Sequence, residues 1–219
     1  MHDGSWQVVA AGYDAIGPRY RDWSSAGPVR LEMVRRLLGR LAEGSTVVDL
    51  GCGPGEPATR LLAARHRVLG VDVSRVQLGL ARQAAPAAAF VRADVTRFAL
   101  RPGTVDAVAS FYALGHLPPA AHAPLLRSIA GWLRPGGVLL TSAPVAAEDD
   151  VQDDWLGVPM YFGAIGERAT YDAVEAAGLQ VRDAEVIGED EGGGHAVRFL
   201  WITATKPTAT DPARSRPAR

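Results

Sequence analysis

Apolar positions along the chain follow two periods, which predict strands that alternate with helices. Short continuous apolar runs, rich in valine and leucine, recur along the sequence. Such runs are typical of parallel strands that are buried on both faces. The segments between them place apolar residues three or four positions apart, as amphipathic helices do. We therefore expect an α/β fold, with strands at 47–50, 67–72, 89–94, 105–110, 138–140, 179–187 and 196–205.

The N-terminal region predicts two helices before the first strand. The first covers 6–22, is interrupted by Gly17 and Pro18, and carries the apolar residues Trp6, Val9, Tyr13, Ile16 and Tyr20. The second begins at Pro28, and its apolar face consists of Val29, Met33, Leu37, Leu38 and Leu41. Its other face carries Arg30, Arg35, Arg36 and Arg40. We expect this arginine face to lie in solvent and to bind no ligand.

The region after the fifth strand departs from a simple alternation of strands and helices. Residues 146–165 begin with acidic residues and continue with aromatic residues and a methionine among turn formers, which predicts an insertion. A helix near 167–177 and the last two strands follow. The proline-rich segment 207–219 has no apolar periodicity, and we expect it to be disordered. Since no linker interrupts 1–206, we expect a single domain.

Composition narrows the class of protein. The 219 residues suit one α/β domain. The 23 basic and 24 acidic residues give no excess of positive charge of the kind that nucleic-acid-binding proteins carry. The sequence has neither an apolar run of membrane-spanning length nor the pattern of a signal peptide, so we expect a cytoplasmic protein without membrane contact. The abundance of arginine, alanine and proline indicates a GC-rich bacterial genome. We expect a small-molecule ligand and a monomer or homodimer.

Metal and cysteine chemistry find little support in the sequence. The single cysteine, Cys52, excludes an internal disulfide and a cysteine-based zinc site. It stands between two glycines, where a small residue beside a ligand is a better interpretation than a nucleophile. The acidic residues at 148–154 have no histidine at ligand spacing among them, so we expect no metal site.

Residues 47–55 contain the most informative motif. An apolar strand ends in Asp49, and Gly51, Gly53 and Gly55 follow at every second position. Glycines at such a strand end let a ligand approach the main chain closely. A dinucleotide loop would have its third glycine one residue later, where Glu56 stands, and a nucleoside-triphosphate loop would need a lysine. The only lysine of the chain is Lys206.

The pattern Asp-x-Gly-x-Gly-x-Gly resembles motif I of the class I S-adenosylmethionine-dependent methyltransferases. Further landmarks of that family follow in order: Asp72 and Asp94 end the next two strands, and Leu-Arg-Pro-Gly-Gly at 133–137 precedes the fifth. The resemblance covers roughly 13–206. It implies a Rossmann-like sheet of seven strands in the order 3-2-1-4-5-7-6, with strand 7 antiparallel and helices on both faces.

The resemblance also implies the positions of the ligands. S-adenosylmethionine is the expected cofactor, with its ribose on Asp72 and its adenine near Asp94. The N-terminal segment, about 6–42, and the insertion, about 146–165, are expected to be lids. The expected cofactor-binding residues are Tyr13, Tyr20, Asp49, Gly51, Cys52, Gly53, Gly55, Asp72, Val73, Gln77, Asp94, Val95, Phe111 and His116. The expected acceptor-binding residues are Tyr112, Trp155, Met160 and Tyr161.

We therefore expect transfer of a methyl group to an oxygen or nitrogen of a small molecule, such as a secondary metabolite. His116 and His195 are the candidate bases, since histidine accepts protons near neutral pH. The alternative is a protein that retains the cofactor without methylating, as a cyclase or a binding protein. A nicotinamide-dependent oxidoreductase is disfavoured by the early third glycine and by the absence of a Tyr-x-x-x-Lys motif. The sequence fixes neither the acceptor nor the methylated atom.

Overall fold

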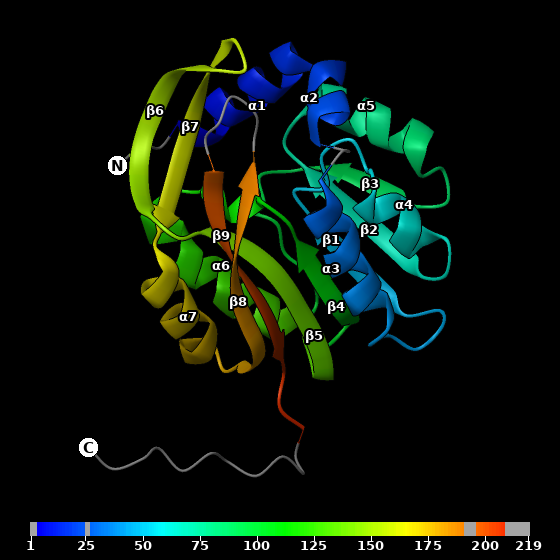
Figure 1. The fold of residues 1–219 in the computed structure, drawn as a ribbon. Helices are drawn as coiled ribbons and strands as arrows, with labels where there is room; N and C mark the ends of the chain where they lie inside the picture. The colour runs from blue at the N-terminus through cyan, green and yellow to red at the C-terminus, as the bar shows by residue number, and fades with distance from the viewer. Residues whose placement is uncertain (1–3, 25–26, 191–195, 209–219) are drawn as a thin grey trace, which may run out of the picture.

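The computed structural model describes residues 4–24, 27–190 and 196–208, which contain one sheet of seven strands (Figure 1). The order is β3-β2-β1-β4-β5-β9-β8, with β9 antiparallel to both of its neighbours and the first five strands parallel. Counted within the sheet, this is the predicted order 3-2-1-4-5-7-6, which is confirmed. The strands are β1 (Thr46–Leu50), β2 (Arg67–Asp72), β3 (Ala89–Arg92), β4 (Val105–Ser110), β5 (Leu133–Pro144), β8 (Gln180–Asp190) and β9 (Ala196–Thr205).

Helices cover both faces of this sheet, as predicted, and each face has its own apolar core. On one face, α3 (Pro28–Leu38) and α4 (Ala58–Ala63) pack against Val47 and other residues of the sheet. On the other face, α6 (Pro119–Trp132) and α7 (Glu167–Ala176) pack in the cluster that contains Val48. Successive residues of β1 thus serve opposite cores, which explains why its sequence is apolar without alternation.

Several strand boundaries differ from the prediction. β5 ends later, at Pro144, and β8 ends later, at Asp190. Strand β5 begins at Leu133 instead of 138, because Leu133 already pairs with Val105 before a register shift places Val138 opposite Ala107. The intervening Arg-Pro-Gly-Gly residues form an irregular bulge of the strand. Strand β3 ends at Arg92, so that Asp94 lies in the loop beyond the sheet.

The predicted helix over 6–22 is divided into two helices in the structure. Helix α1 (Ser5–Ile16) ends at Gly17, which has a φ of +57°, and α2 (Pro18–Ser24) begins directly afterwards. Proline cannot donate the hydrogen bond that a continuous helix would require at position 18, so the chain turns there. Helix α1 lies against α5 (Arg75–Ala84) and against the strand β7 (Val158–Ile165).

The insertion is a β-hairpin of β6 (Ala147–Trp155) and β7 (Val158–Ile165), separate from the main sheet. Figure 1 shows this hairpin rising beside α1 at one end of the molecule. Gly12 allows their close contact, since a Cβ at this position would lie 2.6 Å from the Cε atom of Met160. Of the predicted disordered tail, only residues 207 and 208 belong to the described residues. Within the described ranges, no helix is both long and apolar enough to span a membrane.

Candidate functional site

The loop after β1 bends sharply back towards β2. Gly51 and Gly53 have φ angles of +70° and +53°, which residues with a side chain rarely adopt. A Cβ on Gly51 would lie 2.4 Å from the Cβ of Ala113, so the packing of the neighbouring loop also requires glycine. The amides of Gly51 and Cys52 both donate to the carbonyl oxygen of Val71, which ties the loop to the end of β2.

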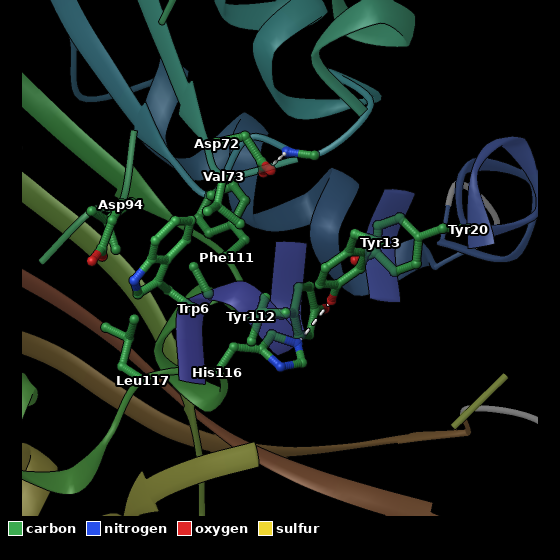
Figure 2. Close-up of a pocket in the computed structure, with 15 residues that line it drawn as sticks. Trp6, Tyr13, Tyr20, Asp72, Val73, Asp94, Phe111, Tyr112, His116 and Leu117 are labelled. Atoms are coloured by element: carbon green, nitrogen blue, oxygen red, sulfur yellow. Dashed lines mark hydrogen bonds between the residues drawn. The ribbon is translucent and has the colours of Figure 1, made fainter. Parts of the chain in front are cut away.

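Asp72 ends β2 with its carboxylate held by backbone amides. One oxygen accepts a hydrogen bond from the amide of Gly53 and the other from the amide of Ser74, each at 2.8 Å. Burial raises the pKa of Asp72, and the hydrogen bonds from the amides of Ser74, Gly53 and Val73 partly offset that effect. Figure 2 shows the side chain at the edge of a cavity. A carboxylate in this place is typical of sites that bind ribose hydroxyls.

The first cavity lies beyond the carboxyl ends of β1, β2 and β4. It is lined by Trp6, Val9, Tyr13, Tyr20, Gly51, Gly53, Asp72, Val73, Asp94, Val95, Phe111, Tyr112, Ala113, His116 and Leu117. Ten of the predicted cofactor-binding residues are among them: Tyr13, Tyr20, Gly51, Gly53, Asp72, Val73, Asp94, Val95, Phe111 and His116. The structure therefore brings together side chains and backbone from five separate stretches of the sequence.

Trp6 also lines the first cavity, a role that the sequence analysis did not assign. Its indole is 37% exposed and extends towards Asp94 and Leu117 (Figure 2). With this side chain in place the cavity measures about 80 Å³, whereas sites for drug-sized ligands measure roughly 300–1,000 Å³. An aromatic residue on the predicted lid helix was the only available signal for this role.

Four predicted cofactor-binding residues do not line the cavity. Asp49 is buried and accepts a hydrogen bond of 2.6 Å from the hydroxyl of Thr59, and burial raises its pKa to about 6. Gly55 has a φ of +78° and lies against Ala81 of α5, where a Cβ would be 3.1 Å from that residue. Cys52 is buried, which raises the pKa of its thiol well above the usual value and keeps it protonated at neutral pH. A nucleophilic role for Cys52 is thus disfavoured.

Gln77, the fourth, contacts α1 and the residue that follows it instead of the cavity. Its side-chain amide donates to the carbonyl oxygens of Tyr13 and Gly17, at 3.1 and 3.0 Å, and the residue is fully buried. Asp14, in the last turn of α1, accepts hydrogen bonds from the hydroxyl of Ser74 and the amide of Val76. These contacts fasten α1 to the beginning of α5. The sequence could not reveal them, because they join residues about 60 positions apart.

His116 follows a short 3₁₀ helix, η1 (Ala113–Gly115), and both of its ring nitrogens have partners. Nδ1 lies 2.9 Å from the carbonyl oxygen of Tyr161, which can only accept, so Nδ1 carries the proton. Nε2 therefore accepts the hydrogen bond of 2.8 Å from the hydroxyl of Tyr13 (Figure 2). Burial lowers the pKa of His116 to about 4, so the ring is neutral at physiological pH.

A second cavity of about 500 Å³ adjoins the first and shares Tyr13, Tyr20, Tyr112 and His116 with it. Two predicted acceptor-binding residues, Tyr112 and Trp155, line it, as do Trp23 and Phe162, which the sequence analysis did not single out. An aromatic cluster of Tyr13, Tyr20, Trp23, Trp155 and Phe162 thus forms much of its wall.

Met160 and Tyr161 do not line this cavity, and the prediction for their side chains needs correction. Both are fully buried in β7, with Met160 packed beneath Gly12 of α1. The hydroxyl of Tyr161 donates to Asp149 of β6 at 2.6 Å. Met160 packs against α1, and Tyr161, which the alternation of side chains places on the other face of β7, bonds to β6. Their neighbour Phe162 lines the second cavity. The other candidate base, His195, lies outside the described residues.

Arg30 contradicts the prediction of an arginine face in solvent. It lines the second cavity, with its guanidinium carbon 4.5 Å from the centre of the Tyr112 ring. The hydroxyl of Tyr112 donates to both carboxylate oxygens of Glu189, at 2.9 and 2.7 Å. Arg35 and Arg36 are exposed, as predicted. Across the ranges that the structure describes, no three His, Cys, Asp or Glu side chains gather in a possible metal site.

Comparisons with known proteins point to one family. A family model described as "Methyltransferase domain" matches residues 47–137. A trans-aconitate 2-methyltransferase of Delftia acidovorans is 35% identical over 220 aligned residues, covering 85% of this chain and 81% of the relative. One from Paracidovorax citrulli is 42% identical over 134 residues, covering 56% of this chain and 50% of the relative. The chain thus spans about half the length of the curated relatives that match it with the highest identity.

Solved structures share the fold at low sequence identity. DhpI in complex with SAH has a TM-score of 0.71 at 18% identity, covering 94% of this chain and 99% of DhpI. The TehB-like SAM-dependent methyltransferase of Corynebacterium glutamicum has a TM-score of 0.66 at 22% identity, covering 90% and 98% of the two chains. The [4+2]-cyclase SpnF has a TM-score of 0.63 at 21% identity, covering 80% of each. Since a cyclase shares it, the fold alone does not define the reaction.

Proposed function

We infer that this chain, which belongs to the class I S-adenosylmethionine-dependent methyltransferases, moves a methyl group from that cofactor to an oxygen or nitrogen of a small molecule. One observation carries the proposal. Two adjoining cavities share four side chains, and the carboxylate of Asp72 lines the first cavity. An acid at the end of the second strand is typical of residues that bind ribose hydroxyls. The trans-aconitate 2-methyltransferases among its relatives act on a small molecule, which supports an acceptor of that size.

The residues around the first cavity fit S-adenosylmethionine. The positive φ of Gly51 and Gly53 leaves the backbone open to a ligand where a Cβ would obstruct it. We assign Asp72 to the ribose hydroxyls, and Asp94 with Val95 to the adenine. When bound, the cofactor supplies an electrophilic methyl group on a sulfonium centre. The protein therefore needs no strong catalyst, only a well-placed acceptor.

The chain's own contribution is to hold the acceptor and to exclude water. Placing two reactants in line can supply roughly 7–11 kcal/mol of the barrier. Four residues, Tyr13, Tyr20, Tyr112 and His116, line both cavities. We propose that the acceptor meets the cofactor between them. Tyr13 and Tyr20 belong to α1 and α2, while Trp155 belongs to the β6–β7 hairpin. We propose that these two segments are the lids that close the site.

We propose that His116 is a positioning residue and not the base. Its unprotonated nitrogen is already engaged by Tyr13, and a pKa of about 4 makes it a weak proton acceptor. The histidine joins α1 to β7 through Tyr13 and the carbonyl of Tyr161. It thereby fixes the tyrosine hydroxyl at the junction of the two cavities.

A pH profile tests this role of His116. The variant His116→Asn is expected to lower kcat by about 10-fold, since one buried hydrogen bond contributes about 0.5–1.5 kcal/mol. Because the folded-state pKa is about 4, the ring stays unprotonated at higher pH, and the ratio of wild-type to variant kcat should be constant between about pH 5.5 and 8.5. A ratio that rises through a pKa near 6.5 would instead identify His116 as a general base. Tyr13→Phe removes the same hydrogen bond. The double variant Tyr13→Phe with His116→Asn should therefore lower kcat by less than the product of the two single effects.

Ligand-dependent melting tests the proposed function as a whole. A ligand at 100 times its Kd stabilises the folded state by about 2.7 kcal/mol, provided that it does not bind the unfolded chain. We expect the melting temperature to rise with S-adenosylmethionine and S-adenosylhomocysteine and to stay constant with NAD. A rise with NAD alone, or with none of the three, contradicts the proposal. Binding of the cofactor without methylation of any acid, alcohol or amine in an acceptor screen favours the cofactor-retaining alternative.

A further inference from the structure

Arg30 has an unusual environment for an arginine. Its Nε atom is buried and has no hydrogen-bond partner among the described residues. Burial disfavours the charged form, but the phenol oxygens of Tyr20 and Tyr112 outweigh that effect, so the net result is a raised pKa. Arg30 is therefore a permanent cation in the wall of the second cavity, with an unused donor. A buried donor without a partner destabilises the free protein, and a ligand that accepts from it can recover this loss.

The acidic groups of the same cavity are already engaged by other residues. Both oxygens of Glu189 accept from the hydroxyl of Tyr112. An oxygen of Glu148 accepts from the side-chain amide of Gln152 at 2.9 Å. Within the described ranges no ion pair to Arg30 is formed, although its charge lowers the pKa values of Glu189 and Asp49 from a distance. Among the described residues, Arg30 thus has no direct carboxylate partner.

The beginning of α3 adds positive potential beside Arg30. Gly27 and Pro28, which precede Arg30 at this helix terminus, line the same cavity. The first turn of a helix has free amides and a partial positive charge, which favours a nearby anion. The Nε atom of Arg30 has no partner in the described part of the chain, while the guanidinium also interacts with the hydroxyls of Tyr20 and Tyr112. Nε and a terminal nitrogen are the pair of donors with which arginine matches the two oxygens of a carboxylate.

We propose that Arg30 binds a carboxylate group in the second cavity. This inference rests on the proposed function. Under that function a carboxylate comes from one of two ligands: the acceptor, if it is an organic acid, or the amino-acid end of the cofactor. An acid acceptor is already ionised at neutral pH and needs no base, which agrees with the absence of a strong base at His116. A cofactor carboxylate would reach Arg30 across Tyr20 and Tyr112, which line both cavities.

Binding measurements with matched variants test the proposal. Arg30→Met removes the charge and keeps the length of the side chain, and Arg35→Met makes the same change at an exposed position of the same helix. Calorimetric titrations use S-adenosylhomocysteine and 5′-methylthioadenosine, which lacks the amino-acid carboxylate. A third titration uses succinate with protein that is saturated with S-adenosylhomocysteine. Arg30→Lys keeps the charge without the paired donors, and it replaces Arg30→Met if that variant does not fold.

Either of two results supports the proposal, and each identifies one source. If the cofactor supplies the carboxylate, Arg30→Met raises the Kd of S-adenosylhomocysteine about 10- to 100-fold and leaves that of 5′-methylthioadenosine unchanged. If the acceptor supplies it, the Kd of S-adenosylhomocysteine stays the same and succinate binding falls by a similar factor. Arg30→Lys should show about a 3- to 10-fold change of the same kind.

Two other results overturn the assignment of Arg30. One is that Arg30→Met matches Arg35→Met in all three titrations. The other is that it weakens S-adenosylhomocysteine and 5′-methylthioadenosine equally, which would make Arg30 only a support for Tyr112. Failure of the proposed function looks different, because the wild-type protein itself would then bind neither adenosyl compound.

Discussion

Replacement of Asp72 by alanine should weaken the binding of S-adenosylhomocysteine by at least about 100-fold. Hydrogen bonds to a charged group contribute about 1.5–3 kcal/mol each, and a carboxylate can accept two from the ribose hydroxyls. The carboxylate is already positioned, because the amides of Gly53 and Ser74 hold its two oxygens at 2.8 Å. Binding thus requires no reorganisation of this side chain. Calorimetric titration of the purified variant measures the effect.

A structural role for Asp72 must be separated from a role in binding, because the same oxygens hold the loop. The melting temperature of the free variant reports the structural loss. The further rise on addition of S-adenosylhomocysteine reports the binding. If the variant melts earlier and the ligand still raises its melting temperature as much as in the wild type, the carboxylate only shapes the loop. The assignment to ribose would then be wrong.

Replacement of Asp49 by asparagine should stabilise the protein at neutral pH by about 3 kcal/mol. Burial raises the pKa of Asp49 to about 6, compared with 3.8 for the free side chain, and each pKa unit corresponds to about 1.4 kcal/mol. The folded state therefore favours the protonated acid. The stability that this proton provides is fully present below about pH 4 and is lost as the pH rises through about 6. Asparagine is neutral at every pH and can still accept from Thr59, which donates to Asp49 at 2.6 Å.

Chemical denaturation at a series of pH values tests this expectation. The difference between Asp49→Asn and the wild type should be greatest above about pH 7 and should disappear near pH 4. For a chain of this size, 3 kcal/mol corresponds to a rise in melting temperature of roughly 6–12 °C. A difference that does not depend on pH would show that Asp49 is ionised without cost in the folded protein.

The first loop illustrates how far the sequence could lead. The spacing of Asp49, Gly51, Gly53 and Gly55 indicated a ligand loop, and the structure gives all three glycines a positive φ. Their tasks nevertheless differ. Gly51 and Gly53 line the first cavity, whereas Gly55 makes room for α5. The motif located the loop, but it could not separate the residues that face a ligand from those that let neighbouring elements pack.

Arg30 and Gln77 illustrate where sequence reasoning failed. Helical periodicity gives the direction of a side chain around its helix axis, but it does not tell what lies beyond the end of the helix. Arg30 is on the polar side of α3 together with Arg35 and Arg36, yet the first turn of α3 reaches the second cavity. Gln77 is on the first turn of α5, where a ligand was expected, but α1 takes up its side-chain amide.

The sequence alone determined the order of the elements, the class of fold and the position of the ligand loop, because these depend on local periodicity and on short motifs. It also placed Asp72 at the end of its strand, and it identified Asp94, which the structure places in the loop beyond β3; both line the first cavity. Only the tertiary structure decided how α1 and the β6–β7 hairpin enclose that end of the sheet. It therefore decided the partners of His116, the place of Trp6 in the first cavity and the place of Arg30 in the wall of the second cavity. These properties arise from contacts between segments that are distant in sequence, and no local pattern records such contacts.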